Sequence, residues 1–399
     1  MTELPAEPSG TAPRPVYLHL GAPKTGTTYL QAMLGAHRDR LLDDGCYYPA
    51  TGTSAHHVEA RDLRDARPRR YVHPSGPGSW DRLVRNVHDW QGQGIALISS
   101  ELLVFTKPDQ VERALRSLQP AEVHLVVTVR DLVRQIPAVW QETVKNGSTK
   151  GYDEFVRRLV EDEEGNGPRG LWNAQDPVRI LDRWGQGIPP ERVHLVTVPP
   201  PGSDPRLLWN RFAQVIGVDP ENYPPVPQPA NTSLGAAETE VVRRINAQVE
   251  KASWPFYSKH IKNGIAQGVL AGRSGGPRLL LPEEVLPLVE RRTKRINETL
   301  AGRGYDIVGS LDDLLPGPDR RGVGPVPEPD AEQLAEAYAL AAEYLARKFA
   351  VSWQRAQKQT GAGRAGRPAA TQGPRPVTPG PAADLLRRGY RSLRRRLRG

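Results

Sequence analysis

The sequence predicts an α/β protein built on a doubly wound parallel sheet with helices on both faces. Four aliphatic runs lack the strict polar–apolar alternation of half-exposed strands, as expected for strands covered on both sides; they are 16–20, 94–103, 122–130 and 192–198. Several of these runs are followed by apolar residues spaced three and four apart, which indicates intervening helices. Ligands of such folds bind at the carboxyl ends of the strands.

The first strand leads into a loop typical of phosphate binding. The run VYLHL (16–20) enters a loop with five small or cationic residues, Lys24, Thr25, Gly26, Thr27 and Thr28, and the chain continues as a helix. A strand, a turn and a helix start direct several backbone N–H groups at one point, where the helix dipole favours an anion. In a Walker A loop the lysine follows the second glycine, whereas Lys24 precedes Gly26. An ordinary ATP or GTP site is therefore disfavoured. The alternative is a surface lysine in a helix-initiating turn.

A second basic position follows the strand at 122–130. This strand ends at Arg130, and the next segment has Leu132, Ile136 and Trp140 in helical phase. Because a guanidinium can fork onto two phosphate oxygens, we expect Arg130 to face the same pocket as the Lys24 loop. The alternatives are a helix-start ion pair between Arg130 and Asp131, and a Walker B-like role for Asp131, which a kinase would need.

Possible general bases come from two other segments. GIALISSELL (94–103) ends with Ser99, Ser100 and Glu101 at the same predicted edge, and a desolvated Glu101 carboxylate would suit proton removal. His56 and His57 start a predicted helix and are the other candidates. The non-catalytic alternatives are that Glu101 is a helix-start glutamate favoured by the helix dipole, and that the two histidines only decorate the surface. The adjacent histidines lack the i, i+4 spacing of a helical metal pair, so no metal is predicted.

The loop at 23–29 resembles the 5′-phosphosulfate loop of sulfotransferases, which use 3′-phosphoadenosine-5′-phosphosulfate (PAPS) as sulfuryl donor. The resemblance implies that Lys24 binds the phosphosulfate and its bridging oxygen, that residues 25–28 hold the 5′-phosphate, and that Tyr29 stacks on adenine. Arg130 matches the arginine of the family's 3′-phosphate motif. The serine that the family has eight residues later is Ala138 here, and Arg134 or a group elsewhere would have to replace its hydroxyl.

The resemblance covers about 15–316 and is strongest to bacterial members of an actinobacterial type. It implies in-line transfer of a sulfuryl group to a hydroxyl of a carbohydrate, glycolipid or other small metabolite, with Lys24 stabilising the leaving phosphate and Glu101 or a histidine as base. SKHIKNGIAQG (258–268) falls where related enzymes close over the 3′-phosphate, which makes Lys262 a candidate. A solvated helix face explains that segment equally well.

Two other functions stay open. A nucleotide-dependent kinase with a variant loop would require Mg²⁺ and ATP. A non-catalytic adaptor that binds a membrane or a polyanion would fit the loss of the hydroxyl at Ala138.

The remaining chain divides by composition. Residues 1–14 are expected to be disordered, 15–316 to form the sulfotransferase domain, and 317–358 to be a linker and a C-terminal helix. The tail at 359–399 carries ten arginines and one acid, so the pI of about 9.7 describes a terminal arm rather than a specific nucleic-acid binder. Its last segment has an apolar stripe at Leu386, Tyr390, Leu393 and Leu397, typical of a helix on an anionic membrane surface. A disordered polyanion-binding tail is the alternative.

The expected location is the cytoplasm, with a peripheral position at the inner membrane face if the tail docks there and the acceptor is lipid-linked. No run of eighteen apolar residues is present, and the single Cys46 suits a reducing compartment. The sequence also predicts that Asn231-Thr232-Ser233 caps a helix.

Overall fold

The computed structural model describes residues 13–49, 55–65, 76–163, 171–227, 233–249, 252–273, 276–317, 319 and 321–362. By its internal contacts the chain divides into two units, Met1–Tyr344 and Leu345–Gly399. The helix α14 (Ala331–Ala362) occupies the segment for which a C-terminal helix is expected. The predicted disorder at 1–14 falls almost entirely outside the described residues, as does the predicted amphipathic helix of the tail.

The first unit contains a six-stranded parallel sheet in the order β2-β3-β1-β4-β5-β6. Its strands are β1 (Pro15–His19), β2 (Cys46–Tyr47), β3 (Ile95–Ser99), β4 (Glu122–Val129), β5 (Val193–Thr197) and β6 (Asp306–Val308). The parallel α/β architecture is confirmed. Leu18 of β1 is in register with Ile98 on one side and Leu125 on the other. The strand order therefore switches direction around β1, and this is where such sheets bind ligands.

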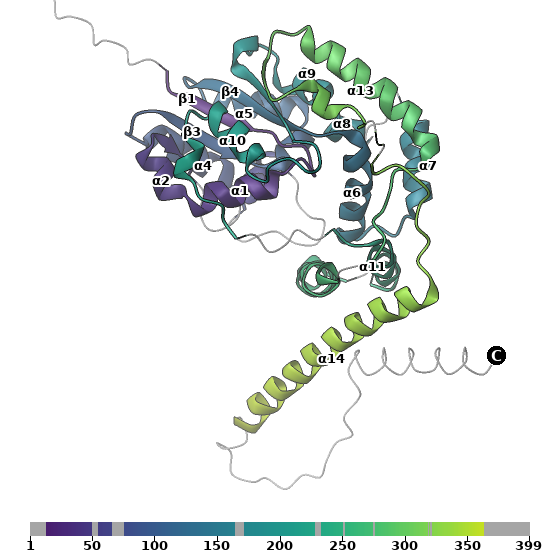
Figure 1. The fold of residues 1–399 in the computed structure, drawn as a ribbon. Coiled ribbons are helices and arrows are strands. Elements are labelled where there is room, and N and C mark those ends of the chain that lie inside the picture. Colours follow the sequence, from purple (N-terminus) through teal and green to yellow (C-terminus); the bar gives the residue numbers. More distant parts are fainter. Residues whose placement is uncertain are drawn as a thin grey trace, which may run out of the picture. The chain divides into compact units, whose positions relative to one another are not determined.

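Successive side chains of the strands point to opposite faces, and helices cover both faces (Figure 1). Leu97, Val126 and Val196 pack with residues of α1 (Thr27–Ala36) and α10 (Leu207–Val215). Leu18, Ile98 and Leu125 belong to the core shared by α4 (Ser79–Asp89), α5 (Pro108–Ser117), α9 (Pro177–Trp184) and α13 (Leu286–Ala301). This two-sided burial explains the continuous apolar runs in the sequence.

The helix α6 (Leu132–Lys145) carries much of the candidate site, is capped at its start and is hydrogen-bonded to the segment of α11 (Ala236–Gln248) further along. The Asp131 carboxylate caps it, accepting the backbone N–H of Arg134 at 2.9 Å. Gln141 Nε2 donates to the Leu234 carbonyl at 2.6 Å, and Asn246 Nδ2 of α11 donates to the Val144 carbonyl at 2.8 Å. These bonds fix the helix in rotation as well as in position.

The predicted cap of α11 is wrong where it can be checked. The helix begins at Ala236 with Gly235 at the N-cap, so Ser233 does not cap it, while Asn231 and Thr232 lie outside the described residues. The Ala236 N–H donates instead to the Pro277 carbonyl at 3.1 Å. A tertiary contact therefore satisfies the donor that a local cap usually satisfies.

Shorter elements connect these parts: α2 (Arg38–Asp43), α3 (His57–Leu63), η1 (Glu101–Phe105), α7 (Tyr152–Glu161), α8 (Trp172–Gln175), η2 (Pro190–Arg192), η3 (Pro220–Asn222), α12 (Trp254–Phe256), η4 (Tyr257–Gln267), η5 (Leu270–Gly272), η6 (Glu283–Val285) and η7 (Leu311–Leu314). Of these, η4 is a π-helix. No helix in the described part of the chain has the length and apolar character needed to cross a bilayer.

Candidate functional site

The Lys24 loop follows β1 at the switch point and holds an unusual backbone conformation. Lys24 has φ of +74° and Gly26 has φ of +84°. Only glycine adopts this left-handed region without cost, so Lys24 is a strained residue of the kind that clusters at functional sites. The buried Thr25 fixes the loop, because its Oγ1 donates to the Ala22 carbonyl at 2.6 Å and lies 2.7 Å from Thr128 Oγ1.

The start of α1 leaves backbone donors available. Gly26 is the N-cap, and no side chain of the described residues caps the helix. The first N–H groups of an α-helix have no intrahelical acceptor, and together with the helix dipole they favour an anion. A Cβ at position 26 would lie 2.4 Å from Leu208 Cδ2, so any other residue would also have to displace the Leu208 side chain.

The structure brings Arg130 to this loop, as predicted from the strand ends. Arg130 Nη1 donates to the Lys24 carbonyl at 2.9 Å. Its Nε is buried and has no hydrogen-bond partner among the described residues. Burial lowers the pKa of Arg130 to about 10, with a smaller contribution from the nearby Arg134. The guanidinium therefore remains charged at neutral pH. One cationic group beside the loop thus keeps unused donor capacity.

Arg134 is engaged at the start of α6. Its guanidinium pairs with the Asp131 carboxylate and donates to the Pro199 carbonyl at 3.1 Å. The alternative ion pair between Arg130 and Asp131 is not formed within the described residues, because Asp131 caps the helix and pairs with Arg134. Ala138, one helical turn further, is half-buried.

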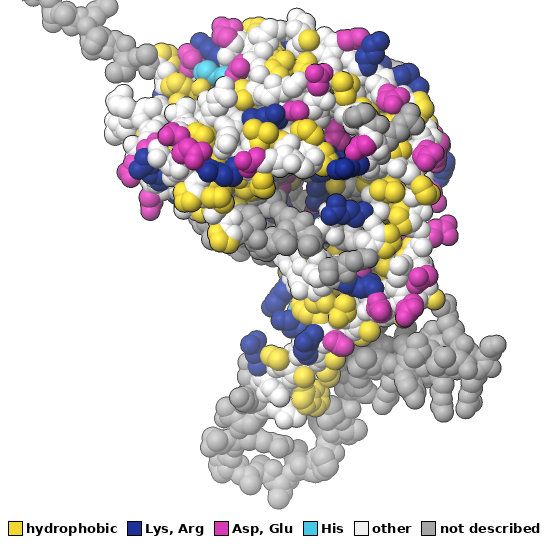
Figure 2. Space-filling view, in the orientation of Figure 1, with side chains coloured by type: hydrophobic (Ala, Val, Ile, Leu, Met, Phe, Trp, Pro, Cys, Tyr) yellow, Lys and Arg dark blue, Asp and Glu magenta, His cyan; other side chains and the backbone are white. Residues whose placement is uncertain are grey.

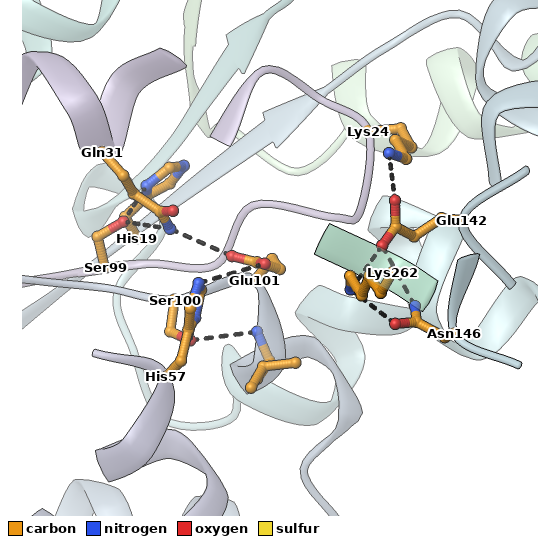
Figure 3. A network of polar contacts seen from close by, with 11 residues as sticks. His19, Lys24, Gln31, His57, Ser99, Ser100, Glu101, Glu142, Asn146 and Lys262 are labelled. Atoms are coloured by element: carbon orange, nitrogen blue, oxygen red, sulfur yellow. Dashed lines mark hydrogen bonds and ion pairs between the residues drawn. The ribbon is translucent and has the colours of Figure 1, made fainter. Parts of the chain in front are cut away.

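The Lys24 ammonium lies in a network that sequence reasoning missed (Figure 3). Its Nζ is 2.6 Å from Glu142 Oε2, and Lys145 Nζ is 2.8 Å from the same oxygen. Lys262 Nζ of η4 is 3.1 Å from Glu142 Oε1, which also accepts from Asn146 Nδ2 at 3.2 Å. Partial burial alone would raise the pKa of Glu142, but the three ammonium groups together hold it well below its usual range.

These contacts bring Lys262 to the site through Glu142, whereas the neighbouring Lys259 is exposed. On the face drawn in Figure 2, Lys and Arg side chains gather around a hollow between α10 and α6. The positions 131, 134, 138 and 142 of α6 form one stripe at spacings of three and four. That spacing is the signal that could have predicted Glu142.

A second network surrounds Glu101 at the end of β3 (Figure 3). Gln31 Nε2 donates to Glu101 Oε2 at 3.2 Å, and His57 Nε2 lies 3.5 Å from Glu101 Oε1. His57 Nδ1 is 3.1 Å from Ser100 Oγ. The side chains of His57 and Glu101 are 29% and 25% exposed, so both can meet a ligand. The structure therefore brings together two of the predicted bases.

His56 is placed differently from His57. Its Nδ1 accepts the backbone N–H of Ser99 at 3.1 Å, and its ring is buried against Tyr48. Burial lowers the pKa of His56 to about 3, so the ring is neutral at physiological pH. His56 ties α3 to the strand end, and the adjacent His57 remains the candidate for chemistry.

A buried polar chain links the second network to the loop. His19 Nδ1 is 2.8 Å from Ser99 Oγ, and His19 Nε2 is 3.3 Å from Thr128 Oγ1, which contacts Thr25. Gln31 Nε2 also donates to Ser99 Oγ at 3.3 Å. Burial lowers the pKa of His19 to about 3. Hydrogen bonds between uncharged groups therefore connect the Lys24 loop to the network around Glu101.

Tyr29 is half-buried on the first turn of α1 and packs against the core between the sheet and α10. Burial raises the pKa of its hydroxyl, and the nearby Arg206 opposes this shift. It lies one residue beyond Thr28 of the loop.

Comparison with known proteins gives no family assignment. No protein-family model matches the chain, and no curated protein matches it.

Proposed function

We propose that this protein is a PAPS-dependent sulfotransferase with a P-loop-like donor site. The observation that carries the proposal is the contact of Arg130 Nη1 with the Lys24 carbonyl at 2.9 Å. It joins two cationic elements, more than a hundred residues apart in sequence, at the switch point of the sheet. A nucleotide with phosphates at both the 5′ and the 3′ position suits such a pair.

The residues present fit this donor. The uncapped start of α1 and the side chains of residues 25–28 would hold the 5′-phosphate, with Lys24 at the phosphosulfate. Arg130 would hold the 3′-phosphate, because its buried Nε lacks a partner in the described structure and guanidinium groups bind phosphate strongly. Tyr29 would stack on adenine. Arg134 and Lys262 would add positive charge, although each already has a carboxylate partner.

The proposed chemistry divides between the two networks. PAPS supplies a sulfuryl group whose transfer is expected to pass through a loose transition state, with negative charge developing on the leaving phosphate. Lys24 stabilises that charge. Glu101 accepts the proton of the acceptor hydroxyl, while Gln31 holds one of its oxygens and His57 lies beside the other. No metal is part of this proposal.

The proposed acceptor is a small-molecule or lipid-linked hydroxyl compound in the cytoplasm. A lipid-linked acceptor would place the protein at the inner membrane face, with the arginine-rich tail as the contact. The kinase alternative gains no support from Asp131, because both of its carboxylate oxygens are engaged in capping α6 and pairing with Arg134. For the adaptor alternative, Lys24→Ala should leave function intact.

Calorimetric titration tests the donor proposal. 3′-Phosphoadenosine-5′-phosphate should bind more tightly than AMP by about one to two orders of magnitude, since charge-assisted hydrogen bonds to the 3′-phosphate are lost in AMP. Arg130→Ala should remove most of this difference. Tight binding of ATP·Mg²⁺ with no gain from a 3′-phosphate would contradict the proposal and favour the kinase.

A further inference from the structure

The Lys24 ammonium is paired with the Glu142 carboxylate. The contact is short, 2.6 Å between Lys24 Nζ and Glu142 Oε2, and the two side chains are 28% and 25% exposed. An ammonium that is paired with a carboxylate attracts a second anion less strongly, because the charge of the carboxylate offsets its own. A ligand phosphate at the loop must therefore compete with Glu142.

The other partners of Glu142 reduce the free energy that is lost when Lys24 leaves its carboxylate. Besides Lys24, the carboxylate has Lys145 at 2.8 Å, Lys262 at 3.1 Å and Asn146 at 3.2 Å. If Lys24 turns away, Glu142 keeps two ammonium groups and an amide, so no buried charge is left unpaired. Lys24 exchanges one anionic partner for another. The site can therefore adopt a second arrangement, which differs in the partner of one lysine.

We propose that Glu142 is a resident counter-ion for Lys24, displaced when the phosphate or phosphosulfate group of the donor binds, and that it thereby sets donor affinity. This inference rests on the proposed function, because it takes the ligand to be the adenosine bisphosphate class. Glu142 is a positioning residue in this scheme. It holds Lys24 in the strained loop before binding and, through Lys262, connects the loop to η4.

The experiment compares Glu142→Gln with the wild-type full-length protein by calorimetry. Glutamine keeps the size and the hydrogen-bonding oxygen but removes the competing charge. Binding of 3′-phosphoadenosine-5′-phosphate should tighten about tenfold, the order expected when one ion pair no longer has to be broken. In the Lys24→Ala background, Glu142→Gln should tighten binding distinctly less, because the competition acts through Lys24.

Glu240→Gln is the matched control. Glu240 is also partly buried and pairs with two cationic side chains, Arg243 and Arg244, but on α11. Its loss should leave the affinity unchanged. If Glu142→Gln does not fold, as judged by thermal unfolding, Glu142→Asp replaces it, because a carboxylate one methylene shorter reaches Lys24 less well. Its binding should also tighten, by a smaller factor.

The outcomes separate the two proposals. Wild-type binding of the bisphosphate well above AMP, with no tightening in either Glu142 variant, would overturn the counter-ion role and leave the donor site intact. Failure of wild type and all folded variants to prefer the bisphosphate over AMP would overturn the proposed function itself, and this inference with it. Equal tightening with and without Lys24 would also contradict the mechanism.

Discussion

The two networks at the carboxyl edge of the sheet differ in charge. The network around Lys24 contains five cationic groups against two carboxylates, namely Lys24, Arg130, Arg134, Lys145 and Lys262 against Asp131 and Glu142. The network around Glu101 contains one carboxylate and histidines, of which His19 and His56 are buried and neutral. Under the proposed function, one half receives negative charge and the other accepts a proton.

Under the proposed function, this difference favours a different ligand for each half of the site. An excess of positive charge beside uncapped backbone donors suits a polyanionic donor. A single half-exposed carboxylate, held by an amide and flanked by an imidazole, suits an uncharged hydroxyl compound that must lose a proton. The neutral chain through His19 connects the halves without adding charge to either.

The largest effect should come from Lys24→Ala. We expect turnover of PAPS with an identified acceptor to fall about a hundredfold to a thousandfold, because charge on the leaving phosphate loses its cation. Lys150→Ala is the control, since Lys150 is more exposed and pairs with Glu154 away from the loop. Steady-state rates measured by bisphosphate release would distinguish the variants. Equal rates for Lys24→Ala and wild type would remove the donor half from the chemistry.

Glu101→Gln should separate the two halves. Turnover should fall about a hundredfold, because a proton acceptor is lost, whereas the affinity for the bisphosphate measured by calorimetry should barely change. Glu122→Gln is a matched control. Glu122 also contacts a histidine, His124, at 3.0 Å, but at the amino end of β4. If Glu101→Gln weakened donor binding as strongly as turnover, the assignment of Glu101 to the acceptor would be wrong.

The buried histidines predict a pH dependence of stability. Burial holds the pKa of His19 at about 3 against 6.5 for the ordinary group, so below about pH 6.5 the unfolded chain binds a proton that the folded protein does not. The stability that depends on a neutral His19 is fully present above that pH and is lost as the pH falls. Between about pH 7.5 and pH 5 this should lower the unfolding free energy by about 2 kcal/mol for His19.

His19→Asn should remove that part of the slope in denaturant titrations at the two pH values. His88→Asn is the matched control, because His88 is exposed on α4. If His19→Asn left the slope unchanged, the His19 imidazole of the wild-type protein would be protonated in the folded state. The two halves would then not be connected by uncharged groups.

The smallest expected effect concerns the strained backbone at Lys24. Because φ is +74°, Lys24→Gly should be more stable than Lys24→Ala by about 1 kcal/mol in chemical denaturation. At Arg85, exposed within α4, the same pair should differ by a similar amount in the opposite direction. A higher stability of Lys24→Ala would mean that the loop relaxes in solution.

The fold was largely predictable because parallel strands that are buried on both faces have continuous apolar runs in the sequence. The runs that became β1, β3, β4 and β5 were recognisable for this reason, and strand ends sharing one edge placed Arg130 near Lys24. The strands β2 and β6 have two and three residues, too few for any periodicity to appear. The π-helix η4 has no period that sequence patterns test for.

The site was predictable only in part, since cross-chain pairing is not encoded locally. Nothing near Lys24 in the sequence indicates that Glu142 is its partner. Glu142 does belong to the stripe of residues along α6 that begins at the edge of the sheet. His19 is a polar residue inside an apolar strand, and its partners Ser99 and Thr128 come from two other strands. Glu101 was expected at a strand end, but β3 stops at Ser99 and Glu101 begins η1.

A crystal structure of the protein with 3′-phosphoadenosine-5′-phosphate would test the central claim most directly. The account predicts the 5′-phosphate on the backbone N–H groups at the start of α1, the 3′-phosphate on the guanidinium of Arg130, and Lys24 turned from Glu142 to the ligand. A bisphosphate bound with its 3′-phosphate away from Arg130, or at another part of the molecule, would contradict the claim that the two elements form one donor site.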